Sequence, residues 1–138
     1  MNKIIQSEIS PWKKRVTVTA VLLLGIFFIL GGVNHFINPQ FYLPLIPDYF
    51  PYHSFFNYAS GAGEVLAGVA VLIPYTRKAG CYAILFLLIV FIPSHIYFIQ
   101  MYGCVSDGLC VSPLIAWVRL IVIHPLLIYW AYSCRNIK

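Results

Sequence analysis

Few residues of this 138-residue chain could do chemistry, and most of them lie inside long apolar segments. Ionisable side chains are costly to bury in a membrane, so they are functional candidates by default. Here they are Glu64, His95, Arg119 and His124, with His35 at the end of the first apolar segment. A glutamate can accept or donate a proton there, and an arginine can bind an anionic or carbonyl group.

Three of these residues are predicted to share one depth. With a helix rise of about 1.5 Å per residue, Glu64 lies on the order of 13 Å below the outer surface, Arg119 roughly 10 Å and His95 roughly 9 Å. An unpaired charge at that depth costs several kcal/mol. We therefore expect a buried polar pocket of Glu64, Arg119, His35 and His95. Its centre would be a Glu64–Arg119 ion pair, with His35 closing the layer from above.

A structural role for these charges is the alternative. A Glu–Arg pair can simply fix the register of two helices, or Arg119 can extend to the outer surface and leave Glu64 protonated. His124 follows Arg119 by five residues and would point about 140° away from it around an α-helix. A structural role is therefore favoured for His124.

Two cysteines, Cys104 and Cys110, lie in the polar loop GCVSDGLCVS. If this loop is extracytoplasmic, a disulfide is expected, and closing so short a loop stabilises the fold by about 2–3 kcal/mol. A catalytic dithiol is the alternative. The spacing is not the C-x-x-C redox signature, which favours the structural disulfide. Cys81 and Cys134 fall near the cytoplasmic side and are expected to stay reduced.

The elements that position these residues are apolar helices. The chain is 61% hydrophobic and only 9% charged, whereas soluble domains are about one quarter charged. About 20 apolar residues of helix cross a bilayer, and residues 16–34, 55–74, 79–100 and 114–132 meet that requirement. We predict an all-α membrane protein in the lipid bilayer, with residues 1–138 forming a single four-helix transmembrane bundle.

The basic residues indicate how the helices are oriented. Both predicted outer loops, about 34–54 and 101–113, contain no Lys or Arg, whereas the other chain segments outside the helices do. Positive residues gather on the cytoplasmic side, so both termini are predicted to be cytoplasmic. Because topology explains the net charge of +5, no nucleic-acid partner is expected.

The first outer loop and the second helix carry two further patterns. The loop NHFINPQFYLPLIPDYFPYHS is rich in proline and aromatic residues, so it should lie at the interface as a lid over the outer end of the bundle. The second helix is rich in small residues, which let helices approach closely around Glu64. They are Ser60, Gly61, Gly63, Ala67, Gly68 and Ala70.

Other site classes find little support. The chain has no phosphate-binding glycine loop and no Ser-His-Asp arrangement, and its ligand-type residues lack the paired spacing of a zinc site. No metal is expected. A haem held by His35 and His95 is disfavoured.

A set of short motifs resembles the DoxX family of small bacterial membrane proteins, mainly over residues 31–93. The motifs are Gly32-x-x-His35-Phe36-x-x-Pro39, Phe41-Tyr42, Ile46-Pro47, Pro51, Ser60-Gly61-x-x-Glu64, Gly68, Leu72, Pro74, Arg77, Ala79 and Phe91-x-Pro93. The resemblance implies a four-helix bundle in the bacterial inner membrane. His95 and the Cys104–Cys110 pair lie outside the family pattern, so the resemblance carries over only His35, Glu64 and Arg119.

The resemblance and the polar pocket together lead to a functional hypothesis. We expect a DoxX-like accessory subunit in membrane redox chemistry, linked to quinones or thiols, with a quinone as its cofactor and other membrane or redox proteins as partners. One alternative is a non-catalytic chaperone or assembly factor that binds partner membrane proteins through the small residues of the second helix. Another is a small-molecule transporter, for which a chain of this size would need to dimerise.

Overall fold

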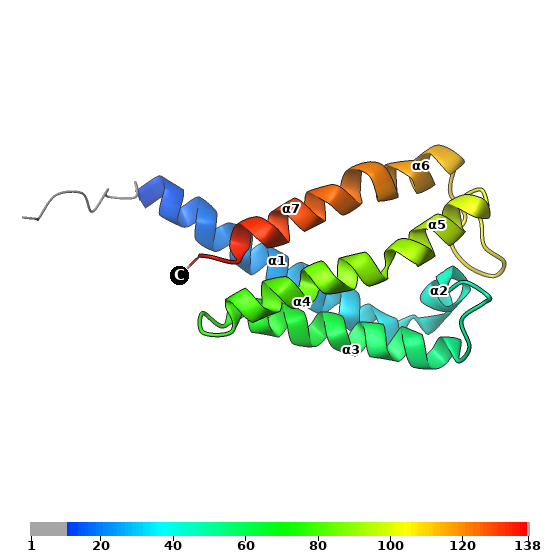
Figure 1. The fold of residues 1–138 in the computed structure, drawn as a ribbon, viewed down its shortest axis with the longest axis horizontal. Helices are drawn as coiled ribbons and strands as arrows, with labels where there is room; N and C mark the ends of the chain where they lie inside the picture. Colours follow the sequence, from blue (N-terminus) through cyan, green and yellow to red (C-terminus); the bar gives the residue numbers. More distant parts are fainter. Residues whose placement is uncertain (1–10, 138) are drawn as a thin grey trace, which may run out of the picture.

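The computed structural model describes residues 11–137, which contain helices and no strand. Four helical segments are long and apolar enough to cross a membrane, as predicted: Arg15–Ile37, His53–Leu72, Arg77–Gln100 and Pro113–Cys134. Each begins and ends within a few residues of its predicted bounds. Figure 1 shows α1 beginning at the end of the molecule where α3 ends, α4 begins and α7 ends.

Helices α1 (Pro11–Ile37) and α3 (His53–Leu72) pack most closely, through glycines. A Cβ atom on Gly61 would lie 2.6 Å from the Cβ of His35 and 2.8 Å from the carbonyl oxygen of Gly32. A Cβ atom on Gly68 would lie 2.7 Å from the carbonyl oxygen of Gly25. Gly61 and Gly68 of α3 therefore serve packing inside the chain.

Helices α4 (Arg77–Val90) and α7 (His124–Cys134) complete the packing near the chain's C-terminal end. Helix α4 covers the other side of α3, where Gly80 lies against its backbone. Arg77 is buried and donates hydrogen bonds to the carbonyl oxygens of Val71 at 3.0 Å, Leu72 at 3.5 Å and Ile137 at 3.0 Å. The same end holds a continuous apolar core, which includes Val21, Leu24, Val71, Ile84 and Ala131.

Breaks in the third and fourth spans separate the helices at the opposite end. The third span stops at Phe91 and resumes as α5 (Ile92–Gln100), since Pro93 has no N–H to continue the hydrogen bonds of α4. The fourth span starts as α6 (Pro113–Val118) and passes through a π-helical turn, η2 (Arg119–Ile123), before α7. Helix α5 packs on α6, and neither comes close to the backbone of α1 or α3 (Figure 1).

Residues 38–52, here called the lid, connect α1 to α3. They include the short helix α2 (Pro39–Tyr42) and the 3-10 turn η1 (Leu43–Leu45). The Ser94 hydroxyl donates to the carbonyl oxygen of Leu45 at 2.6 Å, and the Tyr97 hydroxyl donates to Asp48 at 3.1 Å. The lid is thus hydrogen-bonded to α5, across the gap that the separated helices leave.

Candidate functional site

A cavity of about 430 Å³ lies between the separated helices. Helices α1 and α3 form one wall, α5, η2 and α7 form the other, and the lid contributes Tyr42, Leu45, Ile46, Pro47 and Phe50. Most of its lining is apolar. The polar side chains that line it are His35, Tyr42, Asn57, Ser60, Glu64, Ser94, His95, Arg119 and His124.

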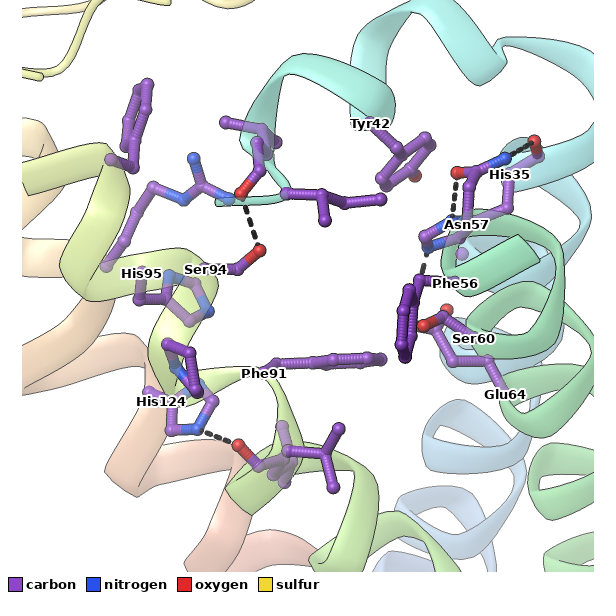
Figure 2. Close-up of a pocket in the computed structure, with 18 of the residues that line it drawn as sticks. His35, Tyr42, Phe56, Asn57, Ser60, Glu64, Phe91, Ser94, His95 and His124 are labelled. Carbon is purple, nitrogen blue, oxygen red and sulfur yellow. Dashed lines mark hydrogen bonds and ion pairs between the residues drawn. The ribbon is translucent and has the colours of Figure 1, made fainter. Parts of the chain in front are cut away.

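The four residues predicted to form a polar pocket all line this one cavity. His35 and Glu64 belong to the α1–α3 wall, whereas His95 and Arg119 belong to the opposite wall. Figure 2 shows His35 and Glu64 facing His95 across the cavity, with the rings of Phe56 and Phe91 between them. The predicted shared layer therefore corresponds to two polar walls with aromatic side chains between them.

The α1–α3 wall is a buried hydrogen-bonded group. Nδ1 of His35 lies 2.8 Å from Oδ1 of Asn57, and Nδ2 of Asn57 donates to the backbone carbonyl of His35 at 3.0 Å. Nε2 of His35 lies 3.7 Å from Oε1 of Glu64. The His35 ring also stacks on Tyr42, with centroids 3.6 Å apart. Three buried polar side chains are thereby held in a fixed arrangement.

The opposite wall carries the cation. Nη1 of Arg119 is buried and has no hydrogen-bond partner within residues 11–137, and the guanidinium carbon lies 5.2 Å from the centroid of the Phe98 ring. The rings of His95 and His124 meet edge to face, with centroids 4.8 Å apart. Nε2 of His124 donates to the carbonyl oxygen of Leu88 at 2.7 Å. This wall can offer a ligand a permanent charge and a free N–H group.

The predicted Glu64–Arg119 ion pair is wrong. Glu64 is paired with His35, which α1 places beside it, and the cavity separates Glu64 from Arg119. The depths estimated from the sequence put both charges in one layer, but depth does not say toward which neighbour a helix turns its side chain. The close crossing of α1 and α3 at Gly32 and Gly61 places His35, rather than Arg119, beside Glu64.

The expectation that His124 points away from Arg119 is also wrong. It assumed α-helical geometry, but the N–H of His124 donates to the carbonyl oxygen of Arg119, five residues earlier, as in a π-helix. Such a turn brings residues five apart onto nearly the same face, and both side chains line the cavity. His124 also has the expected structural role, since it satisfies the Leu88 carbonyl near the break at Phe91.

Asn57, which is only 1% exposed, is a residue of the site that was not predicted from the sequence. A signal for it was present, because Asn57, Ser60 and Glu64 follow the spacing of one helix face. A polar face within an apolar helix indicates a polar interior neighbour. Residues 57 and 60 are uncharged, so the cost of burying a charge does not single them out.

The structure joins Cys104 and Cys110 in a disulfide, outside the cavity. Both cysteines are exposed, whereas Val105 between them is buried against Leu45 and Phe98. A Cβ atom on Gly108 would lie 3.1 Å from Cγ of Pro44. The disulfide loop thus packs on the lid. Cys81 and Cys134 are free and buried in the core near the other end.

Comparison with known proteins gives one family and no individual relative. The family model described as Domain of unknown function (DUF8561) matches residues 24–135, which include every residue that lines the cavity. No curated protein and no solved structure matches the chain.

Proposed function

The chain belongs to the DUF8561 family, and we propose that its cavity binds a quinone headgroup, as a DoxX-like accessory subunit of membrane redox chemistry. The observation that carries the proposal is Arg119, which lines a mostly apolar cavity and whose buried Nη1 atom has no hydrogen-bond partner among the described residues. A buried N–H without a partner is destabilising, so a ligand that accepts its hydrogen bond gains that free energy.

The two walls fit a quinone in their chemistry. A quinone presents carbonyl oxygens at opposite edges of a flat apolar ring, and when bound it would supply two-electron redox chemistry. Arg119 would donate to one carbonyl oxygen, and the His35–Glu64 pair faces the cavity from the other wall. Phe56 and Phe91 offer ring faces and edges between them. Ligand sites of this kind combine an apolar lining with a few polar groups.

The proposed location follows from the sequence pattern and the arrangement of the spans. Lys13, Arg15, Arg77, Lys78 and Arg135 lie near the end of the molecule where α1 begins and α7 ends. If that end is cytoplasmic, the cavity lies in the outer half of the inner membrane. A lipid-soluble quinone would reach it there, and a partner redox protein would exchange electrons with it.

The assembly-factor and transporter hypotheses have less support than a ligand site. The assembly-factor hypothesis relied on the small residues of α3, but Gly61 and Gly68 pack against α1 within the chain. A transporter needs a route across the membrane, and since the helices of one chain pack into a continuous core beyond the cavity, that route would have to run between two copies. A ligand site that does not cross the bilayer is the simpler proposal.

Direct titration tests the proposal. The purified protein in mild detergent is titrated with a short-chain ubiquinone and with menadione. We expect saturable binding by the wild type and a loss of about tenfold or more in affinity for Arg119→Gln, since hydrogen bonds from charged donors contribute about 1.5–3 kcal/mol.

Arg135→Gln is the matched control. Arg135 is partly exposed, packs on Tyr132 and does not line the cavity, so its variant should bind like the wild type. Binding that is absent in the wild type, or equal in the wild type and Arg119→Gln, would exclude the proposed site.

A further inference from the structure

We propose that Asn57 fixes the tautomer of His35, so that the His35–Glu64 pair holds one exchangeable proton and offers it as a hydrogen-bond donor to an acceptor oxygen in the cavity. Asn57 is then a positioning residue and does not touch the ligand. The identity of that ligand as a quinone rests on the proposed function. The protonation of the pair does not.

Two contacts fix the orientation of the Asn57 amide. Its Nδ2 atom lies 3.0 Å from the backbone carbonyl oxygen of His35, which can only accept a hydrogen bond. The amide nitrogen must therefore be on that side, and the amide oxygen faces His35. Because Oδ1 also only accepts, Nδ1 of His35 at 2.8 Å must carry the hydrogen.

The other ring nitrogen of His35, Nε2, lies beside Glu64. A neutral imidazole has a single N–H, so with hydrogen on Nδ1 the Nε2 atom presents a bare lone pair. An ionised Glu64 would also present only lone pairs, 3.7 Å away. Two lone pairs facing each other in a buried site repel. One added proton, on Nε2 or on the carboxyl group, removes the repulsion, and the pair is then neutral overall.

The added proton can point into the cavity. A separation of 3.7 Å is too long for a hydrogen bond, so the proton is not committed within the pair. Both side chains line the cavity, and a carbonyl oxygen placed there could accept it. The pair would thus supply a donor on the wall that faces Arg119.

The surroundings hold this arrangement in place. Asn57, His35 and Glu64 are 1%, 7% and 8% exposed, and the stacked Tyr42 ring restricts rotation of His35. Gly31 leaves room for the carboxylate, since a Cβ atom there would lie 2.8 Å from Oε2 of Glu64. The other ionisable groups that line the cavity are Tyr42 from the lid, His95 from α5, Arg119 from η2 and His124 from α7.

Nitrogen-15 NMR of histidine-labelled protein in detergent tests the tautomer without any ligand. The chain has four histidines, and the loss of one signal in His35→Gln assigns His35. We expect the wild-type ring to be protonated at Nδ1, either alone or together with Nε2. In Asn57→Leu we expect neutral His35 to place its hydrogen on Nε2, toward Glu64. Ser60→Ala is the control, because Ser60 lies on the same face of α3 and makes no hydrogen bond to His35. A wild-type ring protonated at Nε2 alone overturns the proposal, even if Asn57→Leu does not fold.

Quinone titration of two Glu64 variants tests the donor. Glu64→Met cannot carry the proton and should bind a short-chain ubiquinone about tenfold more weakly than the wild type, whereas Glu64→Gln keeps an N–H donor at nearly the same place and should bind like the wild type. Equal affinities of the wild type and Glu64→Met overturn the proposal. Absence of quinone binding by the wild type rejects the proposed function instead, and the tautomer measurement then decides the present inference by itself.

Discussion

Arg77 is buried and Arg119 is partly buried, and the two differ in whether their guanidinium groups have hydrogen-bond partners among the described residues. Arg77 donates to three backbone carbonyls, whereas Nη1 of Arg119 has none. A buried charge without partners costs stability, while one with several partners contributes to it. Arginine is therefore expected to stabilise the fold at position 77 and to destabilise it at position 119.

This difference gives a prediction about thermal stability. Arg119→Met should keep or raise the midpoint of thermal unfolding in detergent, because methionine removes an unpartnered donor and still packs on Phe98. Arg77→Met should lower the midpoint, since it leaves the carbonyl oxygens of Val71 and Ile137 without their donor. A fall of the same size in both variants would contradict the assignment of Arg119 to ligand binding.

At this scale the sequence predicted which residues share one cavity better than how they pair. Burial cost identified His35, Glu64, His95 and Arg119, and all four line one cavity. The partner of Glu64 could not be predicted, because it depends on the angle at which α1 crosses α3. That crossing angle follows from tertiary packing, which residue spacing on single helices does not describe.

Among the elements, the glycine contacts between α1 and α3 decide the shape of one cavity wall. Gly61→Ala should destabilise the protein by about 1–3 kcal/mol, because the new methyl group would meet the Cβ of His35 at 2.6 Å and the Gly32 carbonyl oxygen at 2.8 Å. Unfolding in denaturant, followed by circular dichroism, measures the change.

Gly63→Ala is the matched control on the same helix. Its Cβ atom would meet only the end of the Leu87 side chain, at 3.2 Å, which can move. Alanine also favours a helix over glycine by about 1 kcal/mol. Stability should therefore be unchanged or higher, and a loss equal to that of Gly61→Ala would argue against a specific close crossing.

The disulfide loop and the lid are coupled elements. The double variant Cys104→Ser/Cys110→Ser should lose about 2–3 kcal/mol of stability, since the short loop is no longer closed. Because Val105 and Gly108 pack on Leu45 and Pro44, amide hydrogen exchange should accelerate in residues 38–52. A reducing agent should have the same effect on the wild type and none on the double variant. Unchanged exchange in the lid would show that the loop does not support it.

The breaks in the third and fourth spans mark the limit of prediction for elements. Pro93 and Pro125 were visible in the sequence, but proline in a membrane helix gives anything from a slight bend to a break. The π-helical turn before Pro125 leaves no pattern of its own in residue types. It brings Arg119 and His124 together, so the α-helical count separated two residues that share the cavity.

For the whole molecule, the arrangement of charges predicts which end is cytoplasmic. After reduction with a membrane-impermeant phosphine, an impermeant maleimide should label Cys104 and Cys110 in intact spheroplasts, since both are exposed. In a Cys104→Ser/Cys110→Ser background, Lys78→Cys should be labelled only after permeabilisation. Labelling of Lys78→Cys in intact spheroplasts would reverse the orientation.

The sequence predicted where the apolar spans lie along the chain, but it did not predict how they pack in space. Hydropathy located all four spans, because that signal depends only on the length and composition of each segment. The separation of α5 and α6 from α1 and α3 was not predicted, since it results from helix breaks at similar depths in two different spans. The cavity exists because of that separation.

The hydrogen bond from the Trp130 indole to the carbonyl oxygen of Ala20 joins residues 110 positions apart, at 3.0 Å. During synthesis the ribosome delivers α1 and α3 long before α7. The glycine-packed pair, with His35, Asn57 and Glu64, can therefore assemble early in the bilayer. Arg119 and His124 arrive with the last span, so the cavity is completed only after the final helix has been inserted. Until then, the earlier polar wall faces lipid or the insertion machinery.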